Sequence, residues 1–117
     1  MVEQITESEW NNEWAKSGFL RQLCQMPYSI NEIENKFKLS FTEYTEDGLG
    51  ICFDTYIRIS FQLYRLVGFH DKEDKSHSVV VQVKSFEKDL KALLNNVCKE
   101  FETSIENLAW AMSLDDL

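Results

Sequence analysis

Apolar and polar residues alternate most regularly in residues 51–69, which read ICFDTYIRISFQLYRLVGF. Apolar side chains hold most of the odd-numbered positions there, as expected for a β-strand with one face against a core. One flat strand of this length would extend for about 65 Å at about 3.3 Å per residue. We therefore expect a bend, a bulge or a tight turn near residues 54–55 or Ser60.

Helical signals lie on both sides of this segment. Residues 6–9, TESE, match a capping box and predict a helix over residues 7–26 that ends before Pro27. A second capping box at residues 29–32, SINE, predicts one or two helical turns or a structured loop. Apolar residues spaced three and four apart in residues 86–101 predict an amphipathic helix.

Shorter patterns complete the expected order of elements. Alternation over residues 37–42 predicts a strand, and Glu-Asp-Gly at residues 46–48 predicts the turn of a hairpin. Residues 70–78 are polar and predict a loop, after which the valine-rich residues 79–83 predict a central strand. A third capping box at residues 103–106 predicts a short helix.

Helices at both ends and strands between them indicate the α+β class. Short connections favour a mainly antiparallel sheet, which we expect to have about four strands. The N-terminal and C-terminal helices are expected to pack on one face of it. The length of 117 residues suits a single domain over residues 1–117.

Acidic residues outnumber basic ones by 20 to 12, which gives a net charge of −8. This balance disfavours binding to nucleic acid, which requires a surplus of Lys and Arg. Residues 1–34 carry six acids and two bases, residues 35–84 carry seven of each, and residues 85–117 carry seven acids and three bases. The excess therefore lies in the terminal segments, and terminal helices on one sheet face would gather it on one side of the molecule.

A concentrated negative side speeds the association of a positively charged protein partner. An aromatic side chain among carboxylates is typical of an interface anchor. The competing interpretations are that the tryptophans pack onto the sheet and that the charge maintains solubility. The candidate partner-binding residues are Glu7, Glu9, Trp10, Glu13 and Trp14 near the N-terminus and Asp71, Glu73 and Asp74 in the polar loop.

No motif in the chain indicates a reaction, a metal site or a cofactor, so we expect no enzyme. His70 and His77 flank the polar loop, but their spacing matches no metal-binding motif. Cys24, Cys52 and Cys98 are far apart and have apolar neighbours, as expected for buried thiols of a cytoplasmic protein. The first residues do not read as a signal peptide, and no apolar run is long enough to cross a membrane.

The pattern as a whole resembles the small acidic immunity proteins of bacterial polymorphic and contact-dependent toxin systems. The resemblance lies in the size, the acidity, the order of helix, antiparallel strands and helix, and the late helix of residues 86–101 with the segment ENLAW after it. It implies a protein that binds a cognate toxin domain, often a basic nuclease, and occludes its active site. The chain would act as a monomer or a homodimer.

Three alternatives remain open. A secretion chaperone would hold a client on an apolar groove, for which Tyr56, Tyr64 and Leu66 are available if they face solvent. A phage-encoded inhibitor would mimic nucleic acid with ordered carboxylates. A small enzyme would centre on His70 and His77.

Overall fold

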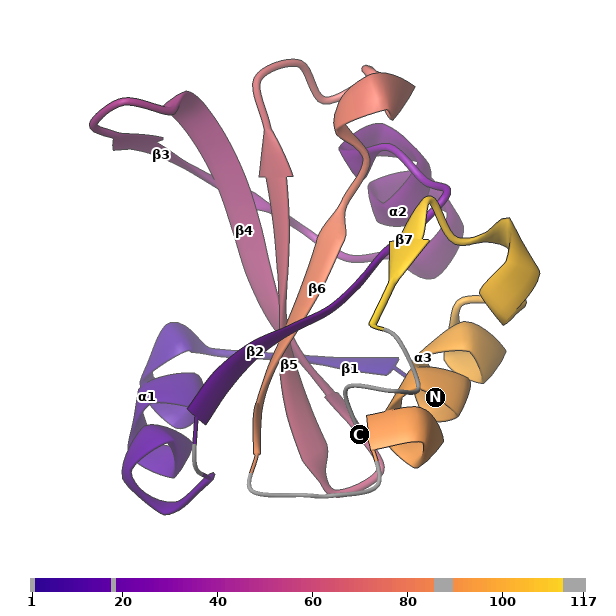
Figure 1. Cartoon of the computed structure of the whole chain (residues 1–117). Coiled ribbons are helices and arrows are strands. Elements are labelled where there is room, and N and C mark those ends of the chain that lie inside the picture. The colour runs from indigo at the N-terminus through magenta and orange to yellow at the C-terminus, as the bar shows by residue number, and fades with distance from the viewer. Residues whose placement is uncertain (1, 18, 86–89, 113–117) are drawn as a thin grey trace.

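The computed structural model describes residues 2–17, 19–85 and 90–112, without the side chains of residues 13–17, 19 and 85. Seven strands from these ranges form one sheet, and three α-helices pack against it (Figure 1). The strands are β1 (Val2–Ile5), β2 (Phe19–Gln25), β3 (Thr42–Glu46), β4 (Gly50–Ile59), β5 (Gln62–Phe69), β6 (Val80–Ser85) and β7 (Trp110–Ala111). The helices are α1 (Glu7–Ser17), α2 (Ile30–Phe37) and α3 (Leu90–Glu100), and two 3₁₀ turns are η1 (Lys75–His77) and η2 (Ile105–Asn107).

The sheet runs in the order β1-β4-β5-β6-β2-β7, and every pairing is antiparallel. β1 and β3 share one edge of β4, since β1 pairs with its second half and β3 with its first half. The expected α+β class and antiparallel sheet are confirmed. The expected number of about four strands is wrong, because β1, β2 and β7 lie in segments whose patterns indicated helix or no element.

The long alternating segment is a hairpin that turns at Ser60, one of the two expected places. Ile59 pairs with Gln62, so Ser60 and Phe61 alone make the turn. Ser60 has a φ of 56°, and the Phe61 side chain is fully exposed at 103%. In this register an odd-numbered residue of β4 lies opposite an even-numbered residue of β5. The side chains that face the main core are therefore odd-numbered in β4 and even-numbered in β5.

The register separates the two faces of the sheet. The row Ile57, Tyr64 and Val83 belongs to the main core, which α2 and α3 cover. The neighbouring row contains Tyr56 and Arg65, and this opposite face carries α1 (Figure 1). The terminal helices thus lie on opposite faces, which corrects the expectation of one shared face. The reason for a common acidic side no longer holds.

The parity change also corrects the expected apolar groove. Tyr64 and Leu66 are buried beneath the helices, while Tyr56 lies on the α1 face. The three side chains therefore do not form one solvent-facing surface, because they belong to different sides of the sheet.

The predicted helix over residues 7–26 is wrong in its second half. Its capping box is confirmed, since the backbone N–H of Glu9 donates to the Thr6 hydroxyl over 3.1 Å. α1 nevertheless ends at Ser17, and β2 pairs with β6 from Phe19 to Gln25. The register of β2 shifts between Gln22 and Cys24, which lets Leu23 and Cys24 both reach the core. Two adjacent buried residues resemble a helical face in the sequence, although here a bulge produces them.

The strand predicted over residues 37–42 is also wrong. The capping box of Ser29 and Glu32 is confirmed, but α2 continues to Phe37 and ends at Lys38, whose φ is 57°. Leu39 and Phe41 are buried in the connection that follows. Tertiary burial, and not pairing, thus produces the alternation there.

Other expected elements are present. The turn over residues 46–48, the loop over residues 70–78 and the central strand after it are confirmed, with η1 as a short addition to the loop. The late amphipathic helix is confirmed as α3, although residues 86–89 lie outside the described part. The third capping box yields only η2, where Ser104 makes no side-chain cap to the backbone. Residues 113–117, for which the position at the chain end predicts fraying, also lie outside the described part.

We predict that Tyr64→Phe stabilises the protein by about 1 kcal/mol, because a buried hydroxyl without a partner is costly. The Tyr64 hydroxyl is buried and makes no hydrogen bond within the described part of the chain. Tyr28→Phe is the control, since the Tyr28 hydroxyl donates to the Phe101 carbonyl over 2.7 Å. It should destabilise by about 1 kcal/mol. Urea unfolding measures both, and a destabilised Tyr64→Phe would contradict the prediction.

Candidate functional site

Trp10 is buried and is not an exposed anchor. Its side chain is 5% exposed and packs with Ile5 and Leu63 in a small second core. The ring centre lies 5.7 Å from that of Tyr56, with the planes tilted by 40°. The interpretation that this tryptophan packs onto the sheet is confirmed, and its role as a surface contact is wrong.

The acidic residues near the N-terminus have different environments. Glu9 is half-buried, closes the capping box and lies 3.2 Å from Nη2 of Arg58. Glu7 is exposed and is available for a partner. The side chains of Glu13 and Trp14 lie outside the described part, so their role stays a prediction.

The carboxylates of the polar loop accept hydrogen bonds from within the loop and from α2. Asp71 accepts from the backbone N–H of Glu73 over 2.9 Å, and Glu73 accepts from the Asn31 amide over 3.1 Å. Hydrogen bonds from Ser76 and His77 lower the pKa of Asp74 to about 2. These contacts give the three acids a local structural function at the surface.

The imidazole rings of the two histidines contact each other. The centres of His70 and His77 lie 4.9 Å apart in an edge-to-face arrangement. No group of three or more His, Cys, Asp or Glu side chains could hold a metal ion among the residues that the structure describes.

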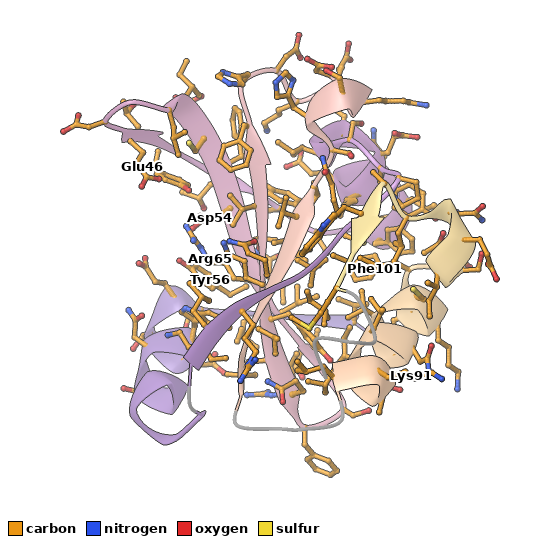
Figure 2. The ribbon with its side chains drawn as sticks, viewed as in Figure 1. Glu46, Asp54, Tyr56, Arg65, Lys91 and Phe101 are labelled. Carbon is orange, nitrogen blue, oxygen red and sulfur yellow. The ribbon has the colours of Figure 1, made fainter. Side chains whose placement is uncertain are left out.

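A group of exposed acidic residues lies elsewhere, on the hairpin that β3 and β4 form. β3 is exposed on both sides apart from the half-buried Tyr44, and the hairpin extends away from the body (Figure 1). Glu43, Glu46 and Asp47 are exposed, and none forms an ion pair with another described residue. Figure 2 shows Glu46 on this outer part. No basic residue occurs between Leu39 and Ile57, a sequence signal that would have identified this surface.

The hairpin also exposes apolar side chains. Leu49 in its turn is 47% exposed, and Ile51 at the start of β4 is 48% exposed. Carboxylates and apolar groups thus occur together on a part of the sheet that none of the described helices covers (Figure 1).

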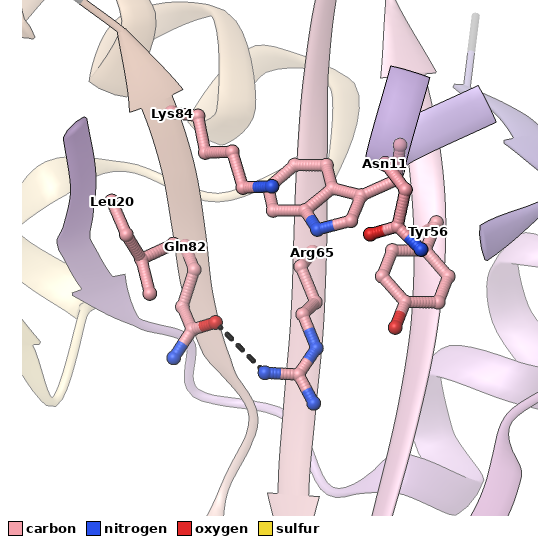
Figure 3. Close-up of a pocket in the computed structure, with 7 residues that line it drawn as sticks. Asn11, Leu20, Tyr56, Arg65, Gln82 and Lys84 are labelled. Carbon is pink, nitrogen blue, oxygen red and sulfur yellow. Dashed lines mark hydrogen bonds between the residues drawn. The ribbon is translucent and has the colours of Figure 1, made fainter. Parts of the chain in front are cut away.

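A cavity of about 450 Å³ lies on the face of the sheet that carries α1 (Figure 3). Its floor is the row Tyr56, Arg65 and Gln82 on β4, β5 and β6. Lys84 extends this floor along β6. The sides come from Trp10 and Asn11 on α1 and Leu20 on β2.

Asp54 fixes the guanidinium of Arg65 at this floor. Its Oδ2 accepts from Nε and Nη2 of Arg65 over 3.1 and 2.9 Å and from the Tyr56 hydroxyl over 3.0 Å. Arg65 also donates to the Tyr44 hydroxyl and, over 3.2 Å, to Oε1 of Gln82. Figure 2 shows Asp54, Tyr56 and Arg65 together on this side. The network links the hairpin, through Tyr44, to the central strands.

Burial and charge shift the pKa values in this network. Burial and the Asp54 carboxylate raise the pKa of Tyr56 to about 12. Burial also raises the pKa of Tyr44. Burial alone would lower the pKa of Arg65. The hydrogen bonds and the negative charge of Asp54 outweigh this effect, so the pKa is raised.

Lys84 is the second cation of the cavity and is only 4% exposed. Its Nζ lies 4.4 Å from the centre of the Trp10 ring, a cation–π contact. Burial, followed by the positive charge of Arg65, lowers the pKa of Lys84 to about 8. Sequence reasoning missed this site, because a lysine after a valine-rich strand resembles an exposed strand end.

Comparison of the chain with models of known protein families, with curated proteins and with solved structures finds no match. Among the described helices, none has the length and apolar character needed to cross a membrane.

We predict that Asp54→Asn destabilises the fold by about 2–3 kcal/mol, because the half-buried Arg65 loses charged hydrogen bonds. Glu3→Gln is the matched control, since Glu3 pairs with Arg58 over 3.4 Å at a more exposed position. It should cost less than about 1 kcal/mol. Urea unfolding measures the free energy of unfolding of both variants. An equal decrease in the two would show that the Asp54 network stabilises the fold no more than a surface ion pair does.

We predict that Lys84→Met changes how the stability of the fold depends on pH, because the pKa of Lys84 is lowered. The ammonium loses its proton near pH 8 in the folded chain, whereas its ordinary pKa is 10.5. The unfolded chain therefore binds more protons between these values, and this group makes stability rise with pH across the window. We expect the variant to exceed the wild type in stability below pH 8 and to lose that advantage as the pH approaches 10.5.

The exposed Lys91 on α3 provides the control, since Lys91→Met removes the same charge on the opposite side (Figure 2). Urea unfolding over the same pH range compares each variant with the wild type. A difference from the wild type that stays constant with pH for Lys84→Met would contradict the shifted pKa.

Proposed function

We propose that this chain is an immunity protein that binds and neutralises a basic, nuclease-type toxin domain. It acts by occupying the active site of that domain and not by catalysis. The acidic hairpin of β3 and β4 carries this proposal, because it combines projection, uncompensated negative charge and exposed apolar groups.

The charge supports fast and selective association. Glu43, Glu46 and Asp47 lie in the stretch between Leu39 and Ile57 that has no basic residue, on a chain of net charge −8. A nuclease cleft that binds phosphate groups is positively charged, so its field attracts such a cluster. Partners of negative charge are repelled by the same groups.

The apolar residues supply affinity once the charges have brought the partner close. Leu49 and Ile51 are each about half exposed beside the carboxylates. Burial of apolar surface, with charged groups at its rim, is the usual composition of a protein interface. A hairpin that projects from the sheet is also suited in shape to enter a cleft.

The first experiment is capture of the partner from the native host with tagged protein at low and high salt, followed by mass spectrometry. We expect one basic protein, bound in about equal amount and less rapidly at high salt. A self-associated chain, or an extended client segment retained at high salt, would favour the chaperone function and contradict this one.

Single charge reversals then locate the interface. We predict that Glu46→Lys slows association with the captured partner about tenfold at low salt. Glu106→Lys is the matched control, because Glu106 is also exposed, lies in η2 and changes the net charge equally. The reversal Glu7→Lys measures any part played by the start of α1. Equal effects of Glu46→Lys and Glu106→Lys would remove the hairpin from the interface.

A further inference from the structure

The cavity on the α1 face has the size of a small-molecule site. Its volume of about 450 Å³ lies within the range of about 300–1,000 Å³ that is usual for ligand pockets. Five elements contribute to its lining, so it is a product of the tertiary structure. The proposed partner surface on the hairpin does not include it.

Two buried side chains of the lining have hydrogen-bond donors without an acceptor in the described part of the chain. Trp10 is 5% exposed, and its indole N–H, which can only donate, makes no hydrogen bond there. Gln82 is 8% exposed, and its amide nitrogen donates to no described residue. A buried donor that stays unpaired costs about 1–3 kcal/mol, a penalty that a ligand with an acceptor would remove.

The orientation of the Gln82 amide follows from Arg65. A guanidinium can only donate, so it must face Oε1 of the amide, which accepts from Nη1 over 3.2 Å (Figure 3). The amide nitrogen is therefore the end that remains for a ligand. Since Gln82 lines the cavity, this part of the wall offers N–H donors to the ligand and not a carbonyl oxygen.

The positive charge of Arg65 is already balanced within the protein. Asp54 lies 2.9 Å from its Nη2 and accepts from two nitrogens of the guanidinium. The ammonium of Lys84 is held against the indole of Trp10, 4.4 Å from the ring centre. The chain as a whole carries −8, so its long-range field repels anions. Neutral acceptors, such as carbonyl oxygens, therefore suit the two unpaired donors.

The rest of the lining suits a flat ring. The rings of Trp10 and Tyr56 lie beside each other, with centres 5.7 Å apart. Leu20 is 44% exposed and borders the cavity from β2. A planar ligand would cover this leucine and contact the aromatic walls, and so bury apolar surface on both sides.

From these features we infer that the cavity binds a small, neutral, planar aromatic compound with carbonyl oxygens. The oxygens accept from the N–H groups of Gln82 and Trp10, and the ring packs against Tyr56 and Leu20. This site is independent of the partner surface, so either conclusion stands without the other.

Isothermal titration of the whole chain with three bicyclic probes tests the inference. We expect coumarin, a neutral planar lactone, to bind with a dissociation constant below about 1 mM. Indole is also neutral, planar and bicyclic, but its N–H only donates, so it should bind about tenfold more weakly. The anion coumarin-3-carboxylate should bind no more tightly than coumarin. No saturation by coumarin up to about 5 mM, equal or tighter binding of indole, or tighter binding of the anion would overturn the inference.

Two further measurements locate the bound probe. The indole N–H resonance of Trp10, followed by NMR, should move downfield with coumarin as the new hydrogen bond forms. Gln82→Glu keeps the oxygen that faces Arg65 and replaces the donor by a second oxygen, so it should weaken coumarin binding about tenfold. Asn107→Asp is the matched control, because it adds the same charge in the exposed η2 and should leave the affinity unchanged.

An unperturbed Trp10 resonance, or the same coumarin affinity in Gln82→Glu as in the wild type, would overturn the assignment. The comparison of the three probes uses wild-type protein and does not depend on the folding of any variant.

Discussion

The register of the β4–β5 hairpin is the constraint on which the rest of the structure depends. Its turn of Ser60 and Phe61 places Ile57 opposite Tyr64 and Tyr56 opposite Arg65. The first pair lies in the main core beneath α2 and α3, and the second lies under α1. A shift by one residue would exchange these faces and put Arg65 into the apolar core, where an unpaired charge is very costly.

Asp54 connects this register to the functional surfaces. It lies on the same face as Tyr56 and holds both Tyr56 and Arg65 through one carboxylate oxygen. Arg65 in turn donates to Tyr44 on β3, so the projecting hairpin and the cavity floor share one polar network. The two surfaces nevertheless differ in charge, because Asp54 compensates Arg65 at the cavity floor, whereas Glu43, Glu46 and Asp47 form no ion pair with another described residue.

Local patterns predicted several elements correctly, and their failures have a common cause. The capping boxes at Thr6 and Ser29 identified the starts of α1 and α2, because capping depends on residues three apart. Leu23 and Cys24 misled because a bulge buries adjacent residues, as a helix does. Leu39 and Phe41 misled because burial in a loop produces the same alternation as a strand. In each case contacts distant in sequence, invisible in a local period, decided the conformation.

The sequence by itself determined the α+β class, an interruption of the long alternating segment at one of two places, the amphipathic α3 and the acidic balance. These features depend on local periodicity, on turn and capping residues and on composition. Only the tertiary structure decided that α1 and α3 cover opposite faces and that Trp10 is buried with Lys84 over its ring. The same holds for the union of Asp54, Arg65 and Gln82 in one network, because strand pairing, and not sequence distance, sets which side chains become neighbours.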